Sequence, residues 1–227
     1  MQLTLSQQGI DIIARLLAFA TAIPFHESAH AFVSDKLGDH TARNLGRLTL
    51  NPLRHIDPWG LLAMLTIGFG WAKPVPINPG AYKNPKTGMA ITAAAGPISN
   101  LLLAYINMVI YKAGFYLSYS VWGSAQPEWA VIVLSIIETL VVINVTLAVF
   151  NMLPIPPFDG SRIFGLFLPT KWYFAVQKYE RYIMFGTLIL LWLGAFSGVL
   201  STAYTYVLRG MSWATGYVDF LFLRFVL

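Results

Sequence analysis

The stretch Phe25-His26-Glu27-Ser28-Ala29-His30 lies inside an apolar segment that runs over about residues 10–37. Ionisable groups are costly inside a bilayer, and where they occur they usually mark a functional site. The two histidines are four residues apart, so on a helix both imidazoles project from one face and can bind one ion. Glutamate next to the first histidine completes the His-Glu-x-x-His pattern that is typical of zinc metalloproteases. The stretch therefore predicts a metal site on a membrane-spanning helix.

The composition of the whole chain is that of an integral membrane protein. Of 227 residues, 56% are hydrophobic and 11% are charged, whereas about a quarter are charged in a typical soluble domain. No linker, repeat or low-complexity tract divides the sequence, so we expect one domain over residues 1–227. The net charge is +5, but the basic residues form no patch interleaved with aromatic side chains, and we expect no nucleic-acid partner.

Four apolar stretches are long enough to cross a bilayer. They cover about residues 10–37, 89–117, 129–152 and 182–208. The first has the apolar core of a signal peptide, but Asp11 stands where positive charge is expected, which favours a retained helix. The tail over residues 211–227 is either an interfacial helix or a further crossing. We expect an all-α polytopic membrane protein with about four full transmembrane helices, and five or six if other segments cross.

Residues 38–88 predict a re-entrant or cytoplasmic element between the first two spans. Residues 47–50 alternate polar and apolar side chains between turn residues, which predicts a strand or a β-hairpin. The apolar stretch over residues 59–71 is shorter than the ~20 residues that a crossing needs. The prolines of residues 73–80 exclude a helix there, because proline removes a backbone donor and clashes with the preceding turn.

Basic residues predict the orientation in the membrane. Seven lie within residues 36–86 and four within residues 162–181, but the N-terminus and the loop over residues 113–128 carry few. The positive-inside rule places the two basic segments in the cytoplasm of a multi-pass cell-membrane protein, and the N-terminus outside. His26 and His30 then lie roughly 9–15 Å from the cytoplasmic end of the first helix, at about 1.5 Å per residue.

A catalytic zinc takes three protein ligands and keeps one position open. The chain has no cysteine, so the third ligand is a histidine or a carboxylate. His40 and His55 fall in the polar cytoplasmic region, where surface or hydrogen-bonding roles are the simpler interpretation. Asp159 follows a proline-rich break after the third span, at a depth that matches the two histidines. Non-helical backbone at that depth faces protein or a water-filled cavity, and we expect Asp159 to complete a site for one Zn²⁺ per chain.

Three motifs together carry a family resemblance. They are Phe25-His26-Glu27-Ser28-Ala29-His30, Ala95-Gly96-Pro97-Ile98-Ser99-Asn100 and Asn151-x-x-Pro154-x-Pro156-x-x-Asp159-Gly160. The chain resembles the site-2 protease family of intramembrane zinc metalloproteases, peptidase family M50, over most of its length. It looks like the short bacterial branch, without a PDZ-like or CBS-like module.

The resemblance implies a reaction and the residues that perform it. It implies a zinc-dependent endopeptidase that hydrolyses peptide bonds of transmembrane substrates. Zinc would be bound by His26, His30 and Asp159, with Glu27 as general base and acid. The partners expected are therefore the lipid bilayer and a transmembrane peptide or protein, and the oligomeric state is left open.

Further roles come from the resemblance alone. Asn151 is expected to hydrogen-bond the substrate carbonyl or the developing oxyanion. Gly96, Pro97 and Asn100 would help to line the substrate path. The region over residues 47–75 would present the substrate in extended form, by analogy with β-strand addition.

Two other classes of function are open on the sequence alone. A catalytically silent membrane scaffold could bind transmembrane helices, but it has no need for a carboxylate beside a metal ligand. A metal or proton transporter could use intramembrane histidines and carboxylates, but transporters usually show internal repeats with paired broken helices. Glu138 has no family role, and it either pairs with Asn144 or faces an outer cavity.

Overall fold

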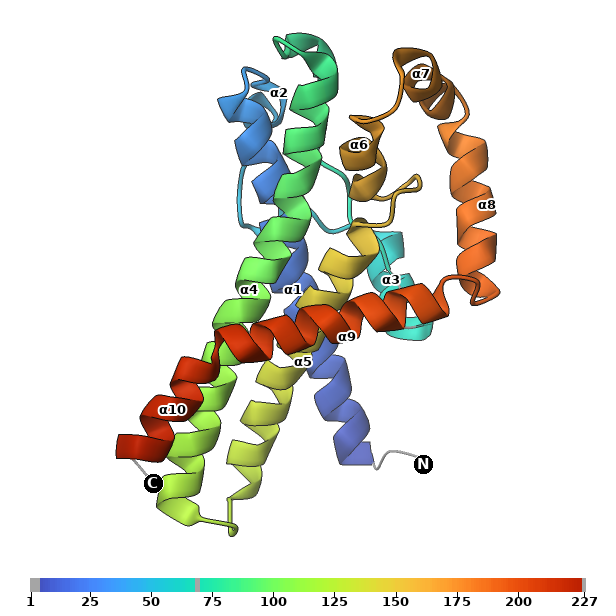
Figure 1. Ribbon diagram of the computed structural model, residues 1–227. Coiled ribbons are helices and arrows are strands. Elements are labelled where there is room, and N and C mark those ends of the chain that lie inside the picture. The colour runs from blue at the N-terminus through green and yellow to red at the C-terminus, as the bar shows by residue number, and fades with distance from the viewer. Residues whose placement is uncertain (1–4, 68–69, 226–227) are drawn as a thin grey trace.

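The structure is a computed structural model that describes residues 5–67 and 70–225. Three long helices form its centre: α1 (Leu5–Lys36), α4 (Pro85–Trp122) and α5 (Glu128–Asn151). α9 (Ser197–Ala214) lies across α4 and α5 (Figure 1). The shorter helices are α2 (Thr41–Asn44), α3 (Pro58–Ile67), α6 (Asp159–Gly165), α7 (Thr170–Lys178), α8 (Glu180–Trp192) and α10 (Gly216–Phe225). Single 3-10 turns occur at Pro52–Arg54 and Pro79–Ala81.

Local sequence signals explain where α4 begins and ends. Asn84 caps its N-terminus, since the Asn84 side chain accepts a hydrogen bond from the backbone N–H of Thr87, and Pro85 occupies the first turn, where its missing donor costs nothing. The helix ends at Gly123, whose φ of 58° lies in the left-handed region that favours glycine. α4 therefore extends a few residues beyond the predicted span at both ends.

The number of spans differs from the prediction. Within the described residues, α4 and α5 are long and apolar enough to cross a membrane, and α8 with α9 makes a third span only if the pair is counted together. That pair bends by 82°, and Gly194 in the break has a φ of 75°, which allows the chain to turn. Residues 182–208 are thus two helices joined by a bend rather than one straight helix. The described residues thus hold two candidate spans, or three with the bent pair counted as one, where about four were expected. The expected first span lies on α1, and the side chain of Asp11 in it is outside the described residues.

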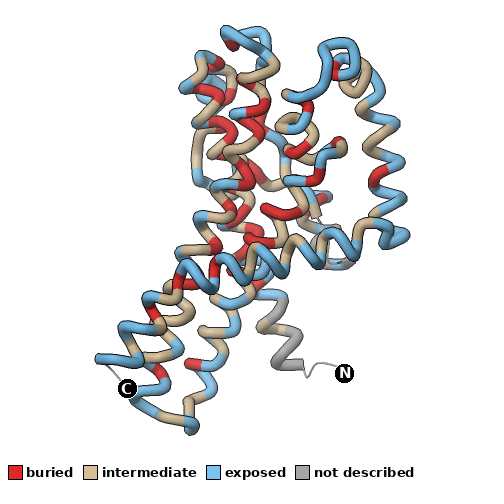
Figure 2. The backbone as a smooth tube through the Cα atoms, viewed as in Figure 1, coloured by how far each residue is buried: buried red, intermediate tan, exposed pale blue. Residues whose placement is uncertain are grey.

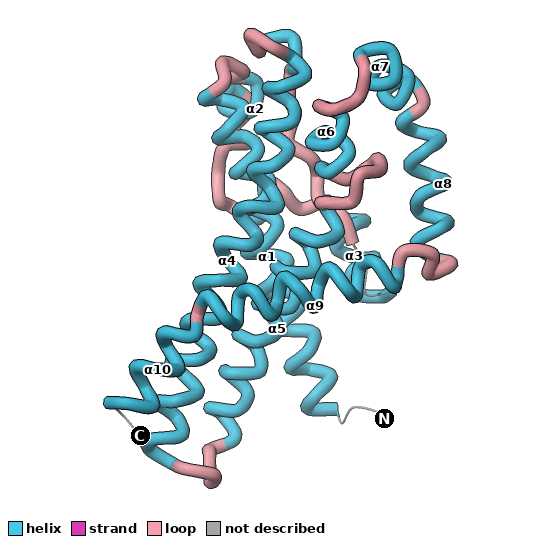
Figure 3. Tube along the Cα trace, in the orientation of Figure 1, coloured by secondary structure: helices cyan, strands magenta, loops and turns pink. Residues whose placement is uncertain are grey.

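The predicted strand or β-hairpin at residues 47–50 is wrong. The described part of the chain contains no strand, and Figure 3 shows this region as loop. The backbone carbonyl of Thr49 accepts hydrogen bonds from two side chains, Ser28 Oγ and His55 Nε2, the second at 2.8 Å. Side chains thus take the place of a partner strand, and alternation of residue types alone could not reveal that.

Two other expectations for residues 38–88 agree with the structure. α3 has ten residues, about half the length of a crossing helix. Residues 73–78 are not helical, as the prolines predict, and the predicted range ends in the single 3-10 turn Pro79–Ala81 rather than in a helix-free loop. Asp39 ties this region to α1, because Asp39 Oδ2 accepts from Ser34 Oγ at 2.9 Å and from the N–H of Asn78 at 2.7 Å. Burial raises the pKa of Asp39, but these bonds and those from Thr41 outweigh it and hold the pKa below its usual value.

The tail packs on α4. Asp219 on α10 accepts hydrogen bonds from Lys112 Nζ at 2.6 Å and from Tyr116 OH at 3.1 Å. α10 has ten residues, too few to cross a bilayer alone. Asp219 of the tail therefore forms an ion pair with Lys112 of α4.

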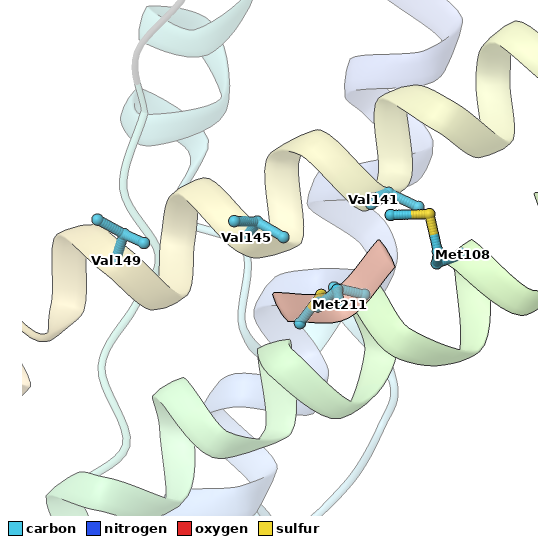
Figure 4. Packing of buried hydrophobic residues seen from close by; sticks show 6 residues of the cluster. Met108, Val141, Val145, Val149 and Met211 are labelled. Carbon is cyan, nitrogen blue, oxygen red and sulfur yellow. The ribbon is translucent and has the colours of Figure 1, made fainter. Parts of the chain in front are cut away.

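The apolar core lies where α4, α5 and α9 meet. Figure 4 shows Met108 of α4 next to Val141 of α5, with Val145 and Val149 farther along the same side of α5. Met211 of α9 belongs to the same cluster. Buried residues concentrate around the upper part of the central helices, whereas most of α8 and α9 is exposed (Figure 2). The metal-site candidates lie on elements that this bundle holds in place.

Candidate metal centre

The structure brings together the three residues predicted as metal ligands. His26 and His30 are one turn apart on α1, and Asp159 is the first residue of α6. The Nε2 atoms of the two histidines are 3.0 Å apart. Asp159 Oδ2 lies 3.1 Å from His26 Nε2 and 3.4 Å from His30 Nε2. One ligand atom of each residue lies within 4.8 Å of the other two. Two helices that are far apart in the sequence therefore form a cluster that could hold one metal ion.

The other ring nitrogen of each histidine determines its tautomer. His26 Nδ1 lies 2.6 Å from Asn100 Oδ1, and His30 Nδ1 lies 2.8 Å from the backbone carbonyl of Thr92. Carbonyl oxygens only accept hydrogen bonds, so the proton of each neutral imidazole is on Nδ1. Both Nε2 atoms then carry bare lone pairs that point at each other and at the carboxylate. Metal-binding histidines usually have this outer hydrogen bond.

The donor set fits a zinc ion. Three bare acceptor atoms about 3 Å apart repel one another unless a cation lies between them. Asp159 Oδ2 is buried, and among the described residues it has no hydrogen-bond donor. Two imidazole nitrogens and one carboxylate oxygen are the ligands of many catalytic zinc sites, which keep a fourth position open.

One face of α4 supports the histidines. Thr92, Gly96 and Asn100 recur every four residues on this face, and all three are buried. A Cβ atom at Gly96 would lie 2.5 Å from His26 Cε1 and from His30 Nε2, so only glycine fits against the two rings. Asn100 orients its acceptor toward His26 because its amide donates to the carbonyl of Ala22 at 3.2 Å and to Asn144 Oδ1 at 3.0 Å.

The sequence reasoning missed Thr92 and Asn144 as supporting residues. Thr92 could have been found, since it precedes Gly96 by one helical turn on the same face as the Gly-Pro-x-x-Asn motif. No signal near Asn144 indicated its bond to Asn100. Glu138 was expected either to pair with Asn144 or to face a cavity. Asn144 is bonded to Asn100 instead, and Glu138 lines a cavity.

A close backbone approach positions Asp159. A Cβ at Gly160 would lie 2.4 Å from the carbonyl oxygens of Met152 and Leu153. Glycine after the aspartate therefore lets the start of α6 pack against the end of α5, which carries Asp159 to the histidines.

A cavity of about 770 Å³ lies between α1 and α5 and reaches the candidate centre. His26, Glu27 and Asn151 border it at one end, and Arg15 and Glu138 lie farther along the same two helices. Asn151 donates an amide N–H to the carbonyl of Leu147 at 3.0 Å, which leaves its second N–H for another acceptor. Polar and apolar groups thus line a space large enough for a peptide segment.

The other residues considered in the sequence lie either against the two histidines or outside the cluster. Gly96 and Asn100 face the histidines, and Pro97 is buried beside them in α4. His40 lies 2.8 Å from Asp35 through Nδ1, and His55 bonds the carbonyl of Thr49, so both are outside the metal-site cluster. The simpler interpretation of these two histidines agrees with that placement.

Comparison with known proteins supports the same assignment. The model of "Peptidase family M50" matches residues 14–194. "Putative zinc metalloprotease YwhC" of Bacillus subtilis (strain 168) is 36% identical over 186 residues, which cover 80% of this chain and 82% of that protein. "Putative zinc metalloprotease Rip2" of Mycolicibacterium smegmatis is 31% identical over 69% of this chain and 57% of its own length. "Putative zinc metalloprotease MJ0611" of Methanocaldococcus jannaschii is 31% identical over 66% of this chain and 69% of its own length. No solved structure matches. These matches confirm the resemblance to site-2 proteases, and the chain belongs to peptidase family M50, a family of zinc metalloproteases.

Proposed function

We propose that this chain is an intramembrane endopeptidase that binds one Zn²⁺ and hydrolyses peptide bonds of transmembrane substrates. The observation that carries the proposal is the convergence of three bare ligand atoms, from His26, His30 and Asp159, beside Glu27 at one end of a large cavity. One wall of that cavity is α5, which is apolar enough to cross a membrane. A peptide bound there is therefore at membrane depth.

The residues divide the chemistry between them. Zinc supplies Lewis acidity, which makes water a nucleophile near neutral pH. Glu27 follows the first ligand in the chain, takes a proton from the attacking water and passes it to the leaving amine. The free N–H of Asn151 donates to the substrate carbonyl oxygen as negative charge develops on it. Hydrolysis consumes water, and the cavity gives water a route to the site.

The residues of α4 act on the histidines in this proposal. Gly96 leaves room for both imidazoles, and Asn100 fixes the orientation of His26. Pro97, which follows Gly96 in α4, is also buried. Their placement supports a role in holding the ligands more directly than the expected role in lining the substrate path.

The orientation is also part of the proposal. The lysines and arginines within segments 36–86 and 162–181 favour the cytoplasmic side for both segments. The end of α1 that carries His30 and the start of α6 then lie toward the cytoplasm, and the N-terminus lies outside. Labelling of single cysteines, introduced one at a time into these segments of the cysteine-free chain, from either side of intact vesicles measures this directly.

The test uses the purified protein in lipid vesicles with a transmembrane peptide. We expect wild-type protein to bind about one zinc and to cleave the peptide, and Glu27→Gln to keep the zinc but lose cleavage. Glu128→Gln is the matched control, because Glu128 is an exposed glutamate at the opposite end of α5 from Asn151. Cleavage by the Glu27→Gln protein would refute the mechanism. No cleavage by zinc-loaded wild type would favour a scaffold, and zinc or proton flux into the vesicles would favour a transporter.

A further inference from the structure

An extended segment, residues 71–78, runs beside the candidate centre and contacts Glu27. The backbone N–H of Val75 donates a hydrogen bond to Glu27 Oε2 at 2.8 Å. Val75 lies between Pro74 and Pro76, and proline has no N–H. Of these three consecutive residues, only Val75 can donate, and its donor is directed at the carboxylate.

The position of this donor is fixed by contacts that do not involve Glu27. Lys73 and Val75 each precede a proline, which restricts both to extended backbone. The N–H of Lys73 donates to the carbonyl of His55 at 2.9 Å, and the carbonyl of Lys73 accepts from Arg47 Nη2 at 2.6 Å. Farther along, the bond between Asn78 and Asp39 holds the other end of the segment. The Val75 N–H is thus presented by a rigid piece of backbone.

Glu27 needs such a constraint. Its side chain has several rotatable bonds, and a general base must be held within hydrogen-bond reach of the proton that it takes. A bond to Oε2 fixes the plane of the carboxylate and leaves Oε1 to accept a proton. We propose that the backbone N–H of Val75 is a positioning group that holds Glu27 in its reactive orientation. This inference rests on the proposed role of Glu27 as general base.

The direct test replaces the amide bond before residue 75 by an ester, introduced as the hydroxy-acid analogue of valine. This change removes the N–H and keeps the isopropyl side chain. We expect kcat to fall by about 10- to 100-fold, as for other groups that orient a catalytic residue, with KM and zinc content unchanged. The matched control is the same replacement at Lys73, which removes a bond to His55 rather than to Glu27. We expect a clearly smaller fall in kcat for that control, because Arg47 and Asp39 still hold the segment and the Val75 N–H is kept.

A second measurement does not depend on activity. Infrared difference spectra, with the Glu27→Gln protein used to assign the band, report the carboxylate stretch of Glu27. We expect this band to shift in the Val75 ester and to stay in place in the Lys73 ester. Val75→Pro against Val75→Ala gives the same comparison by mutagenesis, because only the alanine variant keeps the N–H.

The outcomes distinguish the role of the Val75 N–H from the proposed peptidase function. An unchanged kcat and an unchanged band in the Val75 ester would overturn the inference. Equal losses of kcat in both esters would also overturn it, because the segment would then act only through its rigidity. Absence of cleavage by wild-type protein would instead defeat the proposed function, and the infrared band would still test the contact.

Discussion

Replacing Gly96 by alanine tests the metal centre most sharply. The added Cβ would lie 2.5 Å from His26 Cε1, His30 Cε1 and His30 Nε2, whereas non-bonded atoms of this kind rest at about 3.5 Å. The rings or α4 must therefore move by roughly 1 Å, but ligand distances tolerate only about 0.2 Å. We expect zinc affinity to fall by about 10- to 100-fold, which corresponds to about 1.4–2.8 kcal/mol.

The assay is competition for zinc against a chelator of known affinity, with the protein in detergent or vesicles. Gly114→Ala is the control, because Gly114 is also on α4, and its Cβ would meet only the end of the Leu134 side chain at 3.2 Å. Wild-type zinc affinity in Gly96→Ala would refute the geometry of the site. An equal loss in Gly114→Ala would attribute the effect to α4 rather than to the histidines.

Three further predictions concern other residues of the site and the fold. Asp159→Ala should bind clearly less than one zinc per chain, measured by metal analysis after dialysis, because two ligands remain of three. Asn100→Leu removes the acceptor of His26 Nδ1 and should weaken zinc binding by about tenfold; unchanged binding would show that His26 needs no such partner. The pKa of Asp39 is lowered, so its stabilisation is complete above about pH 4 and is lost as pH falls through the folded-state pKa. The thermal midpoint of Asp39→Asn should therefore fall less between about pH 6 and pH 3 than that of wild type, and an equal fall would contradict this.

The proximity of the three candidate ligands could be predicted from the sequence, because two of them lie in one short motif and the third follows a recognisable break in a helix. His26 and His30 share a helix face, and Asp159 follows a proline-rich break whose depth could be estimated at 1.5 Å per residue. Their support could not be predicted in the same way. The bond between Asn100 and Asn144 depends on how α4 and α5 pack, and the N–H of Val75 has no side-chain signature at all.

The errors concern elements that tertiary contacts determine. Residues 182–208 have the apolarity of one span, but the turn at Gly194 divides them, and a hydropathy pattern does not distinguish a bent pair from a straight helix. Residues 47–50 alternate like a strand, but hydrogen bonds from Ser28 and His55 satisfy the Thr49 carbonyl. Both misassignments arose because the conformation of these segments depends more on their tertiary contacts than on the local pattern of residue types.

The convergence of bare ligand atoms from α1 and α6 has a consequence for how the fold holds together. His30 and Asp159 are 129 positions apart in the sequence, so an ion shared by them closes a long loop of chain. Metal bound only by the folded state adds about 1.4 kcal/mol of stability for each tenfold of free zinc above its Kd. Zinc would then act as a removable cross-link as well as a cofactor, and a chelator should loosen the end of α5 and α6 from α1.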